Sequence, residues 1–234
     1  MRPIAIFRFS ATEGPAYFAD WLDARGLPHA LVAVDQGAAV PADPRAFSGL
    51  CLMGGPMSVN DPLPWIEPVL ALLRRAVAAD VPVIGHCLGG QLLARALGGV
   101  VTRATEPEIG WIEVDVANPG AAKWFGGRTR FATFQWHYEA FSLPAGATHV
   151  LTNRHNVNQA FVVGDRHVGL QCHVEMTAAL VGSWLATGAT ELPEASTAAR
   201  QSAADIRRDL SGRVEALHAV ADDLYARWAR ALER

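Results

Sequence analysis

The sequence has little of what marks a secreted or membrane protein. Only 3 of its 234 residues are cysteine, and they lack disulfide or zinc-ligand spacing, which is typical of a reducing compartment. No apolar run approaches the roughly 18–20 residues that span a bilayer. The apolar start at 3–7 is interrupted by Arg8 and lacks a cleavage site of small residues, so it predicts a buried strand and no signal peptide. These absences predict a cytoplasmic protein.

An excess of one charge is also missing. The formal net charge is −3, which gives no reason to expect nucleic acid or an anionic membrane as a partner. Neither the Gly-x-x-x-x-Gly-Lys-Ser/Thr loop nor Gly-x-Gly-x-x-Gly after a strand occurs. Half of the residues are hydrophobic and 18% are charged. This composition indicates a globular chain that can bury a sizeable core.

Short apolar runs alternate with amphipathic segments through the first hundred residues. We expect helices at 14–25, 64–79 and 89–97, and strands at 3–9, 30–34, 49–53 and 81–85. Continuous apolar strands indicate burial on both faces, as in a parallel sheet that helices cover. The order of these elements predicts a doubly wound α/β fold.

The middle of the chain favours antiparallel hairpins added to this core, with a helix at 176–187. The strands expected there are 110–116, 129–135, 148–153, 157–163 and 166–171.

A second region follows the turn-rich linker at 187–196. We therefore predict a domain over 1–187 and a helical C-terminal extension over 188–234 that packs on it. One apolar stripe marks a long helix in the extension, formed by Val214, Leu217, Ala221, Leu224, Trp228 and Leu232. The stripe either docks on the domain's own core, the interpretation that we favour, or forms the contact of a homodimer.

The segment most informative for function is 81–91, where a buried strand is followed by Gly-x-Cys-x-Gly and the start of a helix. This is the cysteine form of the nucleophile elbow, and Gly85 and Gly89 stand where a Cβ would crowd the turn. A thiol at a helix N-terminus ionises more easily, and the N–H of Leu88 can point at an oxyanion formed on Cys87. We predict that Cys87 is a nucleophile, whereas the other two cysteines are structural.

A cysteine nucleophile needs a base and a group that orients the base. A predicted strand ends at His173 and Glu175, which are two positions apart, so their side chains start on the same side of the chain. We predict His173 as the base and Glu175 as the residue that orients it. The histidines of the predicted hairpins lack zinc-type spacing, and no metal site is predicted.

In this order and spacing the motifs resemble class I glutamine amidotransferases. That family carries Gly-x-Cys-x-Gly-x-Gln and, later, His-x-Glu, found here at 85–91 and 173–175; Gly54-Gly55-Pro56 also follows a predicted strand, as in the family. The resemblance covers roughly 3–186 and is strongest to the stand-alone branch similar to the amidotransferase half of GMP synthase. It implies a flavodoxin-like, mostly parallel sheet and requires no metal or organic cofactor.

The resemblance also implies roles for residues around the cysteine. The N–H of Gly55 would complete an oxyanion hole with that of Leu88, and Gln91 would line the glutamine pocket. Residues 135–144 match a loop in which relatives often have Trp-His-Gly-Asp, whose acid holds the α-amino group of the substrate.

Two departures from that loop change its expected chemistry. The glycine is replaced by Tyr138 and the aspartate by Glu139, which is one methylene longer. Glu139 is therefore either the clamp or a surface acid, since such a shift can misplace a clamp. His137 is either a competing base or a side chain of the pocket wall.

The implied reaction is hydrolysis of the γ-amide of glutamine, or of a γ-glutamyl bond, through a γ-glutamyl thioester on Cys87. Nothing after residue 187 is long enough to be a synthetase domain. The ammonia therefore either reaches a separate synthetase subunit or is released, and the latter includes a γ-glutamyl peptide hydrolase. A rival from another class is a catalytically silent binding or regulatory protein on the same scaffold.

Overall fold

A computed structural model describes residues 1–232 and contains one sheet of nine strands in the order β2-β1-β3-β4-β9-β8-β7-β5-β6. The pairings from β2 to β9 are parallel, and those from β9 to β6 are antiparallel. The parallel strands are β1 (Ile4–Arg8), β2 (His29–Ala33), β3 (Gly49–Leu52), β4 (Val83–His86) and β9 (His167–Leu170). The others are β5 (Val101–Val116), β6 (Arg130–Phe141), β7 (Thr148–Thr152) and β8 (Ala160–Val163).

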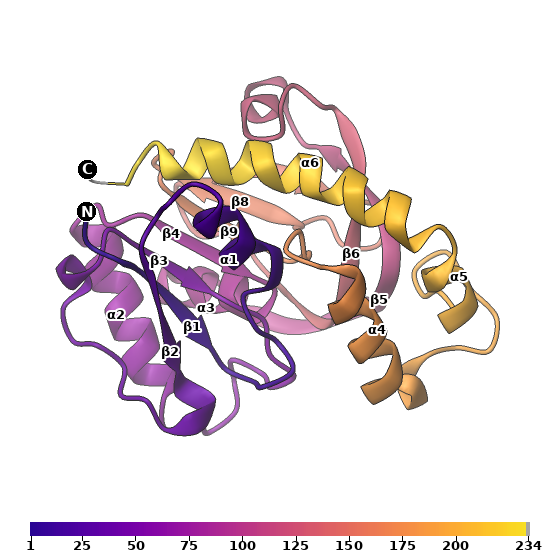
Figure 1. The fold of residues 1–234 in the computed structure, drawn as a ribbon, viewed down its shortest axis with the longest axis horizontal. Helices are drawn as coiled ribbons and strands as arrows, with labels where there is room; N and C mark the ends of the chain where they lie inside the picture. The colour runs from indigo at the N-terminus through magenta and orange to yellow at the C-terminus, as the bar shows by residue number, and fades with distance from the viewer. Residues whose placement is uncertain (233–234) are drawn as a thin grey trace.

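Helices cover both faces of the sheet (Figure 1). Alternate residues of β1 enter two separate apolar clusters, because successive side chains of a strand point to opposite faces. One cluster contains α2 (Ile66–Ala78) and α3 (Leu88–Ala96). The other contains α1 (Ala16–Asp23), α4 (Ala178–Thr187) and α6 (Leu210–Ala229). The predicted doubly wound, flavodoxin-like α/β fold with antiparallel additions is confirmed.

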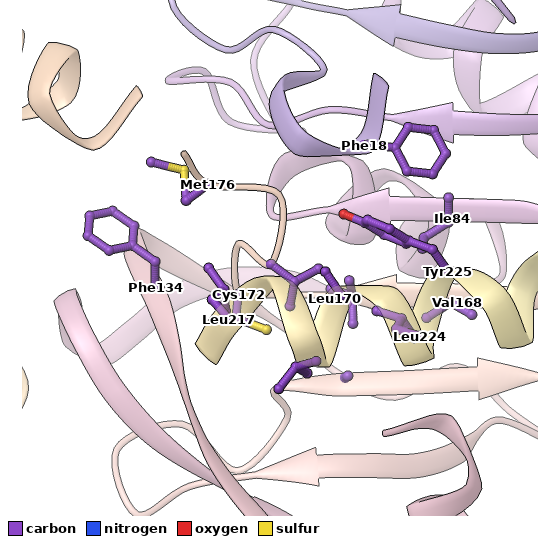
Figure 2. Packing of buried hydrophobic residues seen from close by; sticks show 14 of the residues in the cluster. Phe18, Ile84, Phe134, Val168, Leu170, Cys172, Met176, Leu217, Leu224 and Tyr225 are labelled. Atoms are coloured by element: carbon purple, nitrogen blue, oxygen red, sulfur yellow. The ribbon is translucent and has the colours of Figure 1, made fainter. Parts of the chain in front are cut away.

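The C-terminal helix α6 contributes its apolar stripe to the chain's own core. Leu217, Leu224 and Tyr225 of α6 are at most 1% exposed, and they lie against side chains of β4 and β9 such as Ile84 and Val168 (Figure 2). At about 25 cal/mol per Å² of buried apolar surface, such contacts hold α6 firmly in place.

Several element boundaries differ from those expected. Strand β5 begins at Val101, not at residue 110, and β6 continues to Phe141 through the segment expected to be a loop. These two strands pair over most of their length, with a register shift between Arg103 and Glu108. The expected linker forms the short helix η4 (Ala189–Glu191), and α5 (Ala203–Arg207) was not predicted.

The remaining short helices are η1 (Val34–Gln36), η2 (Pro44–Ala46) and η3 (Pro119–Trp124). Among residues 1–232, no helix is both long and apolar enough to cross a bilayer. The three cysteines are buried and free of disulfides.

The order of the parallel strands determines where a site can form. The chain leaves β1 for β2 on one side, and it adds β3 and β4 on the other side. In an open α/β sheet, such a reversal opens a crevice at the carboxyl ends of the strands. The segments that follow β1, β3, β4 and β9 all begin at this edge, and they carry Glu13, Gly55, Cys87 and His173.

Candidate active site

Cys87 occupies the sharp turn between β4 and α3. Its backbone has φ 48° and ψ −108°, a conformation that non-glycine residues rarely adopt. Glycines make this turn possible, because a Cβ on Gly85 would meet the backbone of Gly89, and one on Gly89 would meet the backbone of Leu52. The predicted elbow is therefore present in the structure, and Cys87 as a residue is 6% exposed.

Two backbone N–H groups are available beside Cys87. Leu88 is the first residue of α3, and the first N–H groups of a helix have no partner within it. A Cβ on Gly55 would lie 2.6 Å from Cδ2 of Leu88, so the two residues are close neighbours. Within residues 1–232, neither N–H donates a hydrogen bond. This arrangement suits a developing oxyanion.

His173 and Glu175 form a buried pair at the end of β9. Nδ1 of His173 lies 2.6 Å from Oε1 of Glu175, and both residues are at most 2% exposed. The backbone N–H of His173 donates to the carbonyl of Phe134 in β6 at 2.9 Å, and the ring of Trp184 packs against the imidazole edge-on. Three elements therefore fix the orientation of this imidazole.

The charges around His173 favour its protonated form. Burial by itself would lower the pKa of His173, but Glu175 and Cys87 outweigh burial and hold that pKa well above its ordinary value. Burial likewise opposes ionisation of Glu175, and His173 and His86 nevertheless lower its pKa. Nε2 of His173 is buried without a well-aligned hydrogen bond in the described chain, so it is free to exchange a proton on the Cys87 side.

A further histidine stands behind the pair. His86 is completely buried, and its Nε2 lies 3.1 Å from the hydroxyl of Tyr225 in α6 and 3.9 Å from Oε2 of Glu175. Burial lowers the pKa of His86. The C-terminal helix therefore contacts the acid of the pair through one intervening side chain.

Two glutamines contact the thiol and the wall opposite it. Nε2 of Gln171 donates to Sγ of Cys87 at 3.7 Å. The amide of Gln91 donates to Oε1 of Gln171 at 3.3 Å and to the carbonyl of Glu139 at 3.1 Å. Gln91 was expected at the pocket and lines it. Gln171 was not predicted, although it precedes the His-x-Glu motif by only two residues.

The expected clamp residue lies at the end of a strand. Glu139 belongs to β6, is partly buried and accepts from the hydroxyl of Ser58 with both carboxylate oxygens, at 3.0 and 2.8 Å. It lines the cavity that contains Cys87. This position favours the clamp over a plain surface acid.

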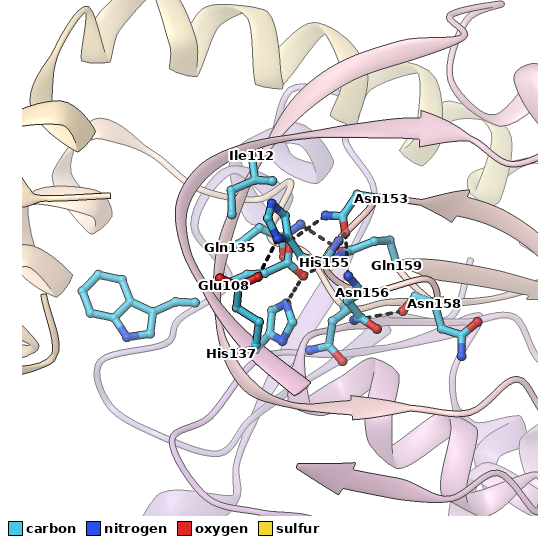
Figure 3. A network of polar contacts seen from close by, with 12 residues as sticks. Glu108, Ile112, Gln135, His137, Asn153, His155, Asn156, Asn158 and Gln159 are labelled. Carbon is cyan, nitrogen blue, oxygen red and sulfur yellow. Dashed lines mark hydrogen bonds and ion pairs between the residues drawn. The ribbon is translucent and has the colours of Figure 1, made fainter. Parts of the chain in front are cut away.

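His137 is held by a buried polar network (Figure 3). Its Nε2 lies 3.1 Å from the carboxylate of Glu108, and its Nδ1 lies 3.1 Å from the carbonyl of Glu139. Glu108 is completely buried and accepts from the side-chain amides of Asn153 and Gln159 at 2.6 Å each. Both nitrogens of His137 face oxygen atoms of this network, which favours a role in the pocket wall over that of a competing base.

Gly55, Cys87, Gln91, His137 and Glu139 line a cavity of about 460 Å³, which lies at the predicted edge of the sheet. Its lining includes three charged residues that were not predicted: Glu13 from the segment after β1, Arg103 from β5 and Glu191 from η4. Glu13 could have been predicted from the sequence, because it follows the first strand and ligands in such sheets bind at the carboxyl ends of the strands. Within residues 1–232, no group of three His, Cys, Asp or Glu side chains could hold a metal.

Comparisons with known proteins agree with this geometry. Residues 19–186 match the family described as glutamine amidotransferase class-I. The glutamine amidotransferase-like protein YfeJ of Salmonella typhimurium is 29% identical over 78% of this chain and 80% of its own length. The GMP synthase of Aeropyrum pernix is 36% identical over 57% of this chain, but that match spans 25% of the synthase.

Solved structures extend the likeness to the whole chain. A glutamine amidotransferase from Methylobacillus flagellatus superposes with a TM-score of 0.97 at 46% identity, covering 100% of this chain and 96% of that one. A glutamine amidotransferase from Thermotoga maritima gives a TM-score of 0.87 at 26% identity, with both chains covered completely.

Proposed function

This chain belongs to the class-I glutamine amidotransferase family, and on that premise we propose that it hydrolyses the γ-amide of glutamine or of a γ-glutamyl compound. Cys87 is the nucleophile, His173 its acid–base partner and Glu175 the group that orients His173. The observation that carries the proposal is the strained Cys87 turn beside a buried His173–Glu175 pair.

In the first step, the thiolate of Cys87 attacks the γ-carbonyl carbon and forms a C–S bond. The carbonyl oxygen becomes an oxyanion, which accepts hydrogen bonds from the N–H groups of Gly55 and Leu88. Loss of one such donor typically slows a reaction by about 10²–10³-fold. As the C–N bond breaks, the imidazolium of His173 gives its proton to the leaving nitrogen.

In the second step, water replaces the amine. The neutral His173 takes a proton from water while the water oxygen bonds to the thioester carbon. The C–S bond then breaks, which restores the thiolate of Cys87 beside the imidazolium and releases a γ-carboxyl product. Glu175 keeps the ring oriented and stabilises its positive charge in both steps.

The cavity lining suits the charges of a γ-glutamyl group. We assign Glu139 to the α-ammonium group and Arg103 to the α-carboxylate, because these oppositely charged side chains line the same cavity as Cys87. His137 and Gln91 act as wall residues that hold the backbone of Glu139.

The fate of the ammonia distinguishes two versions of this function. A relative from Sulfurisphaera tokodaii, 34% identical over 53% of this chain, is named as one of the subunits of a GMP synthase. This likeness supports an acceptor that is a separate synthetase polypeptide. Hydrolysis without a partner is the other version. Glutamine turnover that stays low until a synthetase partner is added would favour the first, and turnover of a γ-glutamyl peptide by the protein alone would favour the second.

The direct test is covalent labelling at neutral pH with an electrophilic glutamine analogue, read by mass spectrometry. We expect one adduct on Cys87, no adduct in Cys87→Ser and strongly reduced labelling in His173→Ala. Glutamine and γ-glutamyl compounds are then screened for products with the wild type and Cys87→Ser. A wild-type protein that is neither labelled nor active would favour the silent binding protein.

A further inference from the structure

Glu13 differs from the other carboxylates of the cavity in its position and in its hydrogen bonding. The ring of His173 and the carboxylate of Glu13 lie against the same side of Gly54, where a Cβ would clash with Glu13 and approach Cε1 of His173 to 3.0 Å. Gly54 precedes Gly55, the assigned oxyanion donor. Glu13 therefore stands next to the residue that protonates the leaving nitrogen.

The other two acids of the cavity already have hydrogen-bond donors. Glu139 accepts from Ser58, and Oε2 of Glu191 accepts from Nε1 of Trp136 and the hydroxyl of Tyr138 at 2.9 Å each. Glu13 is partly buried, and within the described chain its carboxylate accepts no hydrogen bond. The imidazole of His173 lies beside it, but the charged carboxylate has no hydrogen-bond donor, and removing such a group from water is costly.

Burial changes the titration of this group. It raises the pKa of Glu13 from its ordinary value of 4.5 to about 7, with Glu175 adding to the shift and His173 opposing it. An ammonium group placed beside Glu13 would reverse that shift, because an opposite charge favours the ionised carboxylate.

We propose that Glu13 binds an ammonium group carried by the leaving amine, so that the substrate class is a γ-glutamyl amide of a diamine or polyamine. This inference rests on the proposed function. The γ-glutamyl part uses Glu139 and Arg103, the scissile nitrogen lies at His173, and the alkyl chain of the amine reaches the Glu13 carboxylate. Cleavage follows the steps above, and the diamine leaves with the proton from His173.

The test compares three amides that differ only at the far end of the leaving amine. They are γ-glutamyl-(4-aminobutyl)amide, which is cationic, γ-glutamyl-pentylamide, which is neutral, and the γ-glutamyl amide of 4-aminobutyrate, which is anionic. A desolvated charge-assisted hydrogen bond contributes about 1.5–3 kcal/mol, which corresponds to about 10–100-fold. We therefore expect kcat/KM for the cationic amide to exceed that for the neutral one by this factor, with the anionic amide poorest.

The variant Glu13→Gln keeps the shape of the side chain and removes its charge. We expect the ratio of cationic to neutral kcat/KM to fall to within about twofold of 1, since a neutral amide cannot replace the ion pair. The matched control is Glu194→Gln, the same change at an exposed acid outside the cavity lining. In this control the ratio stays at the wild-type value.

A binding measurement separates recognition from catalysis. In a Cys87→Ala background, calorimetry with the cationic and neutral amides should give the same order of affinity, and Glu13→Gln should remove the difference. If Glu13→Gln lowers turnover of all three amides equally, Glu13 acts in proton transfer or folding and the inference is overturned. Equal wild-type turnover of the three amides would overturn the inference about Glu13 and leave the proposed function standing. No turnover and no labelling of Cys87 would overturn the proposed function as well.

Discussion

The five parallel strands and the four antiparallel strands bring different chemistry to the same cavity. Segments that follow parallel strands carry Cys87, His173 and Glu175. The antiparallel strands carry Glu108, His137 and Glu139, which form a rigid polar wall.

The difference follows from how the two kinds of strand end. Parallel strands end at one edge, so segments far apart in sequence meet there and can combine their side chains. Antiparallel strands run past the cavity and present residues along their length, so recognition depends on strand register. We therefore expect substitutions in the first group to lower kcat and those in the second group to weaken binding or folding.

The largest effect is expected for Glu175→Gln. The glutamine keeps the shape but loses the charge that orients and stabilises His173, as in other catalytic triads. We expect kcat/KM to fall by about 10³–10⁴-fold, or roughly 4–5.5 kcal/mol, mostly through kcat. Steady-state kinetics would check this. A fall through KM alone would contradict the assignment of the parallel half to the chemical step.

Glu108→Gln tests the antiparallel wall. The new amide would place an NH2 group against the donors Asn153 and Gln159 and leave Nε2 of His137 without its carboxylate partner, which should cost about 3–4 kcal/mol of folding free energy. Urea unfolding measures this loss. The control is Glu106→Gln, whose partner His155 lies 2.8 Å away in a half-exposed pair, where about 0–1 kcal/mol is expected.

A retained fold with a lower kcat and an unchanged KM in Glu108→Gln would break the proposed comparison. It would assign the wall to the chemical step as well as to binding.

Glu13→Gln tests the same comparison at an exception. Glu13 follows a parallel strand, yet it is proposed to bind substrate and not to act in the chemical step. Burial raises the pKa of Glu13 from 4.5 to about 7. The unfolded chain therefore loses this proton at lower pH than the folded chain does, and wild-type stability falls between about pH 4.5 and 7. The variant should be more stable by up to about 3 kcal/mol above pH 7 and equally stable near pH 4. Thermal unfolding at both pH values checks this, and an equal difference at both would contradict it.

Tyr225→Phe should have the smallest effect, about 1 kcal/mol of stability, because it leaves Nε2 of His86 without its hydroxyl partner. The same change should lower kcat by a few-fold, since His86 lies beside Glu175. The control is Tyr17→Phe, which removes a hydrogen bond to Asp222 in α6 but leaves His86 untouched. Equal kcat in both variants would show that α6 only packs.

The sequence predicted the parallel half well because its signals are local. A continuous apolar run, flanking glycines and an amphipathic segment placed β4, Cys87 and α3 within about two residues of their observed bounds. The positions of His173 and Glu175 followed from a motif at a strand end. Their approach to Cys87 depends on the pairing of β4 with β9, which the motif alone cannot specify.

The antiparallel half was predicted less well. The start of β5 was missed by nine residues, because the alternation that marks a strand is interrupted by the register shift before Glu108. Glu191 was assigned to a linker, and only tertiary folding brings it to Trp136 and Tyr138. The domain boundary after residue 187 stays a prediction, although Glu191 shares the cavity with the first region.

The backbone conformation of Cys87 lowers folding stability but places the thiol needed for activity. A non-glycine residue at φ 48° and ψ −108° costs on the order of 1–3 kcal/mol. Cys87→Gly would relieve that cost and abolish the thiol together. In a lineage no longer selected for activity, replacement of this cysteine by glycine would therefore increase folding stability. Inactive descendants of this fold are expected to carry glycine at the elbow.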